Sequence, residues 1–273
     1  MAGLTKTQAI AQLRSELMDP GSTIWSDTQL GAYIDRAAKE ISRKVPLQKR
    51  VGLPFNSGTR DVDLTALSDI IMILAVETPA GEEPPSFRNW SVLADRLTVA
   101  LTGAPTVSEA NLTGTLTFTS ASAAVTGAGT QFATEVAVGD FIRRSTDSPW
   151  YRVLSIESAV ALTLDEVYGG TTGADAGVTK LRTSGSVVRV YYGMVHTVGE
   201  SSSTMPARCD AALLEGAQAY ACTGMSVFTS NKVNIGADAM AEYFAQGRQK
   251  MALYMEKLDS LEEIYVGQTY PLD

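Results

Sequence analysis

Hydrophobic residues near the N-terminal end of the chain recur with the period of α-helices. Ile10, Leu13 and Leu17 share one face of a predicted first helix, which the sequence DPG ends. A second helix is predicted from WSDTQL, where Ser26 and Gln29 have the pattern of a capping box. Apolar residues then keep helical spacing until a proline interrupts them. Two amphipathic helices in succession predict a helical hairpin.

The pattern becomes extended between Leu47 and Thr102. RDVDL alternates, DIIMILAVETP is a short apolar run typical of a strand, and WSVLADRLTVAL fits either a strand or a helix. Farther along, the run from Ser186 to Met194, SVVRVYYGM, is rich in β-branched and aromatic residues and predicts another strand. We expect it to pair with the run from Ile70 to Glu77 in a small sheet, which brings the two flanks of the chain together.

Helical periodicity returns after Pro206. MPARCDAALLEGAQAYACTGMSVF predicts a helix whose alanines permit close packing, and a long helix is predicted from Gly236 onward. One side of this long helix carries Met240, Phe244, Met251, Leu258 and Leu261. The helical pattern is lost at Gly267, so we expect the chain to end in an extended arm.

The segment 111–182 differs in composition from both of its flanks. It consists mainly of Thr, Ser, Ala, Val and Gly, and short alternating runs such as TGTLTFTS and VALTLDE are separated by turn residues. This spacing is typical of a compact β barrel or sandwich. The sequence therefore predicts an α+β fold: a helical bundle core with a small β-sheet, formed by residues 1–110 and 183–273, interrupted by an inserted all-β barrel or sandwich domain at 111–182.

Charge and hydropathy narrow the classes of function. The net charge of −8 opposes wrapping of nucleic acid, because such binding depends on Lys and Arg displacing counterions. No run reaches the roughly 18 uncharged apolar residues of a membrane span, and the N-terminal stretch lacks the apolar core of a signal peptide. We expect a soluble protein made in the cytoplasm, without membrane contact. Cys209 and Cys222 have neither metal-ligand nor redox-pair spacing and are expected to be small core residues.

The glycines of VTGAGT resemble a phosphate-binding loop only superficially. Gly127 and Gly129 are followed by neither a third glycine nor a lysine, so both the dinucleotide fingerprint and the P-loop pattern fail. We expect these glycines to permit a turn between two strands, after which Phe132 enters the core.

Candidate catalytic residues are few. His196 is the one histidine of the chain, and no Gly-X-Ser-X-Gly turn accompanies it. Paired carboxylates occur as Asp61 with Asp63, Glu82 with Glu83, and Glu262 with Glu263. These pairs lack the further ligands that a metal site requires, so we expect solvated charge, no enzyme activity, no metal and no cofactor. The basic cluster SRKVPLQKR fits contact with an acidic partner or a phosphate backbone, and equally a helix end where cations favour the dipole.

The order of these features resembles that of the head-to-tail adaptor, or connector, proteins of tailed bacteriophages. The resembling stretches are WSDTQLGAYIDRAAKEISRKVP, DVDLTALSDIIMILAVETP, and SVVRVYYGM followed by the alanine-rich helix entered at MP. The inserted segment resembles a β module of many phage virion proteins in VTGAGTQF, VGDFI and LTLD. We therefore expect a structural virion protein.

The resemblance implies a place and a set of partners. Such adaptors form a dodecameric ring beneath the portal protein, at the head-tail junction of the virion, which docks the tail and extends the DNA channel. The implied partners are the portal protein, a neck or tail-completion protein, and further copies of the chain, while DNA passes through the lumen without specific binding. In the family, C-terminal arms bind the portal. The corresponding arm here carries Ile264, Tyr265, Val266, Tyr270 and Leu272.

Two other assignments remain open. The chain could be a tail-completion or other neck or tail structural protein, since the β module occurs in tail and neck proteins alike. The module could also bind carbohydrate through stacking on Trp150, Tyr151 and Tyr168, although we expect these rings to fill its core.

Overall fold

A computed structural model describes most of the chain as two compact units. The described residues exclude Met1, Ala66, Glu83, 107–108, Ser148, 177–179, Thr183, 231–236 and 266–273. The helical unit comprises the residues up to Gln48 and those from Gly193 onward, and the β unit runs from Lys49 to Tyr192.

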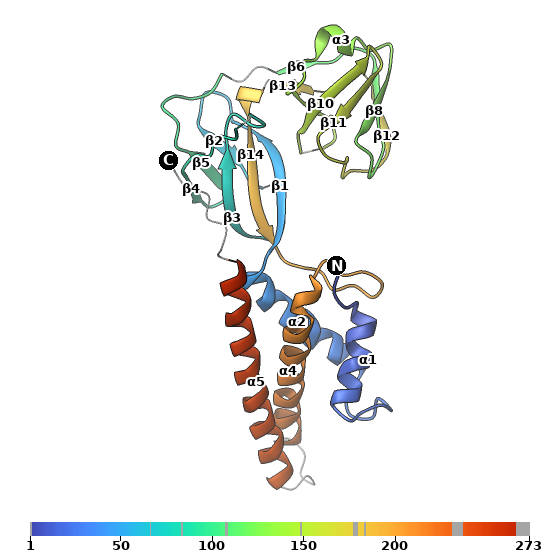
Figure 1. The fold of residues 1–273 in the computed structure, drawn as a ribbon, viewed down its shortest axis with the longest axis vertical. Coiled ribbons are helices and arrows are strands. Elements are labelled where there is room, and N and C mark those ends of the chain that lie inside the picture. The colour runs from blue at the N-terminus through green and yellow to red at the C-terminus, as the bar shows by residue number, and fades with distance from the viewer. Residues whose placement is uncertain are drawn as a thin grey trace. The chain divides into compact units, whose positions relative to one another are not determined.

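The helical unit is built from both ends of the chain. Its helices are α1 (Lys6–Glu16), α2 (Asp27–Lys44), α4 (Asp210–Ser230) and α5 (Ala237–Tyr265), with the short 3-10 helix η2 (Ala207–Cys209) before α4. The predicted helical hairpin is confirmed, because α1 and α2 follow one another and contact each other. Helix α1 begins with a capping box of Thr5 and Gln8, and α2 begins with the predicted one of Ser26 and Gln29. Helices α4 and α5 lie side by side (Figure 1).

Three helices of this unit meet around one tyrosine. Tyr254 of α5 is fully buried, and its hydroxyl donates a hydrogen bond of 3.3 Å to the carbonyl oxygen of Ala37 in α2. A Cβ on Gly216 of α4 would lie 2.7 Å from the Tyr254 ring, so only glycine fits at that contact. The core around this point includes Leu13, Ile34, Ile41, Leu213, Leu258 and Leu261, together with the predicted Cys209.

The β unit contains two three-stranded sheets. In the first, β14 (Val187–Met194) lies between β1 (Leu47–Pro54) and β3 (Ile70–Glu77), so the predicted pairing of β3 with β14 is confirmed (Figure 1). In the second, β5 (Arg96–Val99) lies between β2 (Asp61–Asp63) and β4 (Trp90–Leu93). The ambiguous run WSVLADRLTVAL is therefore a β-hairpin, whose register pairs Trp90 with Val99.

An eight-stranded sheet forms the rest of the β unit, and we call residues 109–182 the β module. Its strands in spatial order are β12 (Gly173–Ala176), β7 (Thr115–Phe118), β8 (Ala124–Ala128), β11 (Ala161–Leu164), β10 (Tyr151–Ser158), β9 (Phe141–Arg143), β13 (Lys180–Arg182) and β6 (Glu109–Asn111). The short helices α3 (Phe132–Glu135) and η1 (Ser184–Ser186) complete the unit. The predicted division into residues 1–110 with 183–273 and an insert at 111–182 remains a prediction.

The predicted α+β class with a helical bundle core is wrong. Among the described residues, fourteen strands in sheets of three, eight and three stand against five α-helices, and the β unit spans more than half of the chain. The prediction treated the short apolar runs between Leu47 and Thr102 as additions to a helical core. Instead β2, β4 and β5 pair with one another and bury their own side chains, including Val62, Leu97 and Val99.

The glycine turn VTGAGT is only partly as predicted. Gly129 has a positive φ of 69°, which glycine adopts without strain, and Phe132 is fully buried. The turn leads from β8 into the short helix α3 rather than into a second strand. The segment therefore leads the chain from β8 into α3 and brings Phe132 into the core of the β module.

Candidate interaction site

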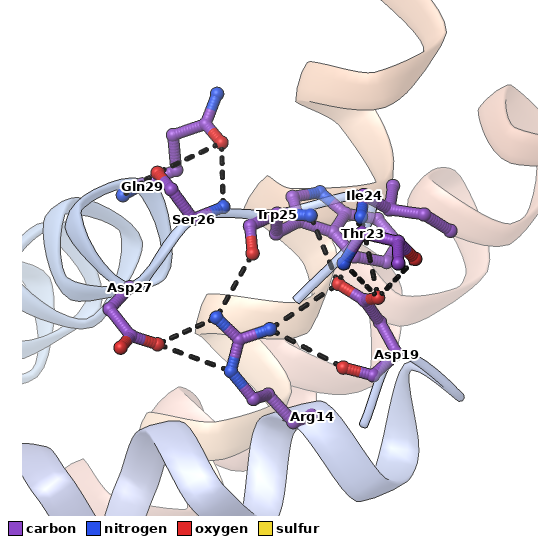
Figure 2. Close-up of polar contacts among 8 residues, drawn as sticks. All are labelled: Arg14, Asp19, Thr23, Ile24, Trp25, Ser26, Asp27 and Gln29. Atoms are coloured by element: carbon purple, nitrogen blue, oxygen red, sulfur yellow. Dashed lines mark hydrogen bonds and ion pairs between the residues drawn. The ribbon is translucent and has the colours of Figure 1, made fainter. Parts of the chain in front are cut away.

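The loop between α1 and α2 is organised by the carboxylate of Asp19 (Figure 2). One oxygen of this carboxylate accepts hydrogen bonds of 2.8 Å from both the amide and the hydroxyl of Thr23, and the other accepts one of 3.0 Å from the amide of Trp25. Donation from Trp25 is the largest cause that lowers the pKa of Asp19, to about 2. The ionised carboxylate thus accepts hydrogen bonds from loop amides that a helical hairpin would otherwise leave without an acceptor.

Arg14 connects this loop to both helices. Its guanidinium lies 3.3 Å from the Asp19 carboxylate and 2.6 Å from that of Asp27 at the start of α2, and it donates to the carbonyl oxygen of Trp25 at 3.0 Å (Figure 2). Two apolar side chains of this loop are exposed: Met18 is 85% exposed and Ile24 is 42% exposed.

A groove of about 490 Å³ lies beside this loop. Leu17, Met18 and Trp25 line it from the loop, and α4 and α5 contribute Gln218, Cys222, Glu242, Gln246, Gln249 and Lys250. Burial raises the pKa of the Cys222 thiol and so favours its protonated form.

The exposed face of α2 carries a basic stripe, which we define as Arg36, Lys39 and Arg43. Spacings of three and four residues place the three side chains on one helix face, and all three are exposed. Arg36 stacks over the ring of Tyr220 with 4.0 Å between its guanidinium carbon and the ring centroid. Burial is the largest cause that raises the pKa of Tyr220 to about 12.

The predicted basic cluster 42–50 is not a single surface. Ser42 and Val45 are buried, Lys44 lies 3.6 Å from Asp259, and Arg50 of β1 lies 3.6 Å from Glu166. Among these residues, Arg43 joins the basic stripe of α2. The sequence signal for that stripe was its spacing of three and four residues, which the prediction overlooked.

His196 lies after β14 and is buried. Its ring nitrogens lie 3.1 Å from the carbonyl oxygen of Val45 and 3.3 Å from the hydroxyl of Thr204, and burial lowers its pKa. Its backbone amide donates to the hydroxyl of Ser42 at 2.9 Å. These bonds make His196 a structural connection between the segment after β14 and the end of α2.

Of the predicted carboxylate pairs, Asp61 with Asp63 is the one whose two side chains the structure describes. Asp61 accepts from the hydroxyl of Thr98 at 2.7 Å, and Asp63 accepts from the amide and hydroxyl of Thr65. The Thr65 amide is the largest cause that lowers the pKa of Asp63. Glu83 and the side chains of Glu262 and Glu263 lie outside the described residues. Within the part of the chain that the structure describes, no three His, Cys, Asp or Glu side chains group as metal ligands.

The aromatic rings of the β module are core residues. Trp150, Tyr151 and Tyr168 are at most 7% exposed, which leaves no stacking platform for a sugar ring. Tyr151 and Tyr168 pack against each other with centroids 5.3 Å apart. The alternative of carbohydrate binding through these three rings is therefore contradicted.

A buried ion cluster joins the β module to the sheet of β1, β14 and β3. Arg189 of β14 lies 2.5 Å from the Asp165 carboxylate of the module and 3.8 Å from that of Glu77 in β3. Tyr191 donates to Glu77 at 2.7 Å. Burial opposes the charge of Arg189, and the two carboxylates outweigh it, so its pKa is raised. A single arginine within the apolar run SVVRVYYGM was the sequence signal for this cluster.

The predicted portal-binding residues are only partly described. The backbone of Ile264 and Tyr265 forms the last turn of α5, which ends at Tyr265. Val266, Tyr270 and Leu272 lie outside the described residues. The arm therefore remains a prediction.

Comparison of the sequence with protein-family models and with curated proteins gave no match. In the described residues, no helix combines the length and the apolar character needed to cross a bilayer.

Proposed function

We propose that this chain is a structural protein of a tailed-phage virion: a head-to-tail adaptor that forms a ring beneath the portal protein, extends the DNA channel and docks the tail. The sequence resemblance supports this proposal in its two flanks. Those flanks supply α1 and α2 on one side and α4 and α5 on the other, which pack into one helical unit.

The observation that carries the proposal is the set of large apolar side chains that α5 leaves exposed. Phe244 is 53% exposed, Met255 50% and Leu253 39%, whereas Leu258 and Leu261 are buried. Phe244 was predicted to share the packed side with these leucines, and the side chain of Met240 lies outside the described part. Large apolar side chains that remain exposed on a long helix favour an assembly surface over a freely solvated one.

Genetic complementation tests this function. A phage that lacks this chain should accumulate DNA-filled heads and free tails that do not join, and addition of the purified chain to the heads should restore joining. Normal joined particles in its absence would contradict the proposal. If the mutant heads accept wild-type tails while the mutant tails reject wild-type heads, the chain is the alternative, a tail-completion protein.

The resemblance also assigns portal binding to the C-terminal arm. Aromatic and apolar anchors in an extended segment can add strand-like hydrogen bonds and fill pockets on a partner. Deletion of Gly267 to Asp273 should abolish binding to purified portal protein and leave the circular dichroism spectrum unchanged. If the truncated chain still binds the portal protein, the arm is not the portal-binding segment.

A further inference from the structure

The first part of β3 is strongly apolar, and yet it is not buried. Its residues from Ile70 to Leu74, IIMIL, all carry large hydrophobic side chains, but four of them are only half-buried and Met72 is 38% exposed. The neighbouring strand β14 buries six of its eight residues. Large apolar side chains on both faces are typical of a strand that is covered on both sides. This part of β3 therefore lacks a cover.

The backbone of β3 is also open along one side. β3 is an edge strand of its sheet, with β14 on its inner side (Figure 1). On its outer side, the Arg88 amide donates to the carbonyl oxygen of Val76 at 2.9 Å, and the Thr78 amide donates to that of Ser86 at 3.0 Å. This pairing ends there, because from Trp90 onward the chain pairs with β5 instead. The outer pairing thus covers only the last residues of β3.

The unpaired part of this edge presents backbone groups to a partner. In a strand, the peptide groups of successive residues point alternately to its two sides. Because Val76 and Thr78 use outward groups, the amides and carbonyls of Ile70, Met72 and Leu74 also point outward, away from β14. Among the strands of the described residues, none lies beside them. An edge of this kind is a template for another extended chain.

A groove of about 490 Å³ lies along this open edge, and we call it the β3 groove. Ile71 and Ile73 line it from β3, and Trp90 and Val92 line it from β4, which is the edge strand of the second three-stranded sheet. The groove thus begins where the chain after β3 turns away to form β4. An added strand with apolar side chains at every second position would fill this groove.

The charged residues that line the β3 groove are both acidic. Asp69 and Asp95 are exposed, and within the described part of the chain neither carboxylate forms an ion pair. Arg96, which follows in the turn of the hairpin, lies 3.4 Å from Asp61 instead. Arg88 lies at the paired end of β3 and does not line the groove. The groove therefore favours a segment that carries a cation over an acidic one.

We propose that the β3 groove docks an extended segment of a partner protein that is apolar at alternate positions and carries lysine or arginine. The segment adds as a strand to the open edge of β3, and its cation lies beside Asp69 or Asp95. The C-terminal arm 266–273 fits poorly, because its one charged side chain is Asp273. This inference goes beyond the proposed function, since the site belongs to the β unit and does not depend on a ring.

Two synthetic peptides of equal length test the site on the full-length chain. Both alternate valine with threonine, and one carries lysine near each end where the other carries glutamate. Fluorescence anisotropy measures their binding, and hydrogen exchange followed by mass spectrometry reports on the amides of β3. We expect the lysine peptide to bind at least about tenfold more tightly than the glutamate peptide. It should also slow exchange in the fragment that contains Met72, because strand addition protects outward amides.

Met72→Pro removes one of these outward amides, and proline is tolerated in an edge strand at such a position. This variant should bind the lysine peptide at least about tenfold more weakly, whereas Met72→Val, the matched control that retains the amide, should bind as the wild type does. Circular dichroism verifies folding. A second variant, Asp69→Asn with Asp95→Asn, leaves the edge intact and should lose the preference for lysine over glutamate.

Three results would overturn the proposal. The first is that neither peptide binds, and the second is that both peptides bind equally well to the wild type. The third is that the lysine peptide binds only after removal of residues 266–273, which would make the arm, rather than a partner protein, the occupant of the groove. Unchanged binding by a folded Met72→Pro variant would likewise exclude strand addition at β3.

Discussion

At the scale of single residues, the structure depends on charges buried inside turns and sheets. Asp19 was predicted only as part of a helix-ending DPG sequence, yet its carboxylate binds three backbone amides of the following loop. Sequence shows that an aspartate favours such a turn. It does not show that Arg14, one helix earlier, lies within reach of the same carboxylate, because that contact exists only once α1 and α2 have packed.

The pH dependence of stability should reveal the role of Asp19. Its pKa is lowered in the folded chain from 3.8 to about 2, so its stabilising contribution is complete above about pH 4 and is lost as the pH falls toward 2. Asp19→Asn should lower the Tm by several degrees at pH 7, and the difference from wild type should shrink between pH 4 and pH 2. Thermal unfolding followed by circular dichroism measures both.

Asp27→Asn serves as the control for Asp19. The Asp27 side chain is 73% exposed, so its ion pair with Arg14 should contribute at most about 1 kcal/mol. An Asp19→Asn variant as stable as Asp27→Asn at every pH would show that the loop does not depend on the carboxylate.

Arg189 should be far more important than an exposed arginine of the same unit. Arg189→Leu leaves Glu77 buried without this cation and leaves Asp165 to the more distant Arg50, 4.0 Å away. Removal of one partner of a buried ion pair typically destabilises by about 3–5 kcal/mol. Arg96→Leu, which removes a 66% exposed partner of Asp61, should change stability by about 1 kcal/mol or less. Urea unfolding of both variants gives the comparison, and equal effects would contradict the structural role of the cluster.

At the scale of elements, periodicity and capping patterns predicted α1, α2, α4 and α5 because each helix has a continuous apolar face. The run WSVLADRLTVAL could not be assigned, since both periods fit its apolar residues. The structure resolves it as a hairpin because Leu97 and Val99 are buried when β5 pairs with both β2 and β4. The choice between strand and helix for this run depends on pairing with strands that are distant in the sequence. A local pattern of apolar residues carries no information on such pairing.

The close contact of Gly216 with Tyr254 predicts that alanine at position 216 is less favourable than glycine, which reverses their usual order in helices. Replacement of glycine by alanine within a helix normally stabilises it by about 1 kcal/mol. In Gly216→Ala the new Cβ would lie 2.7 Å from the fully buried Tyr254 ring, so the variant should instead be destabilised by about 1–3 kcal/mol.

Gly31→Ala in α2 is the matched control for this inversion. Its Cβ would meet the Lys6 side chain at 3.6 Å, an ordinary contact, so the variant should be neutral or up to about 1 kcal/mol more stable. Thermal unfolding of the two variants in parallel distinguishes them, and stabilisation by both would mean that Tyr254 moves aside without loss.

At the scale of the whole molecule, the sequence predicted that the residue pattern changes at the β module. It did not predict how much of the chain belongs to the β unit. The short strands β2, β4 and β5 are of three or four residues each and leave little periodic signal. They join β1, β3, β14 and the β module in a unit larger than half of the chain, which is why the predicted helical core was wrong. The exposure of Phe244 and Met255 was equally hidden in the sequence, because it depends on which face of α5 packs.

The copy number of this chain in the virion tests the central claim most directly. Quantitative mass spectrometry of purified DNA-filled heads without tails would measure it relative to the portal protein. Equal copies of the two proteins are the result expected of a ring seated on the portal. Absence from such heads, together with presence in free tails, would contradict the adaptor assignment and place the chain on the tail side of the junction.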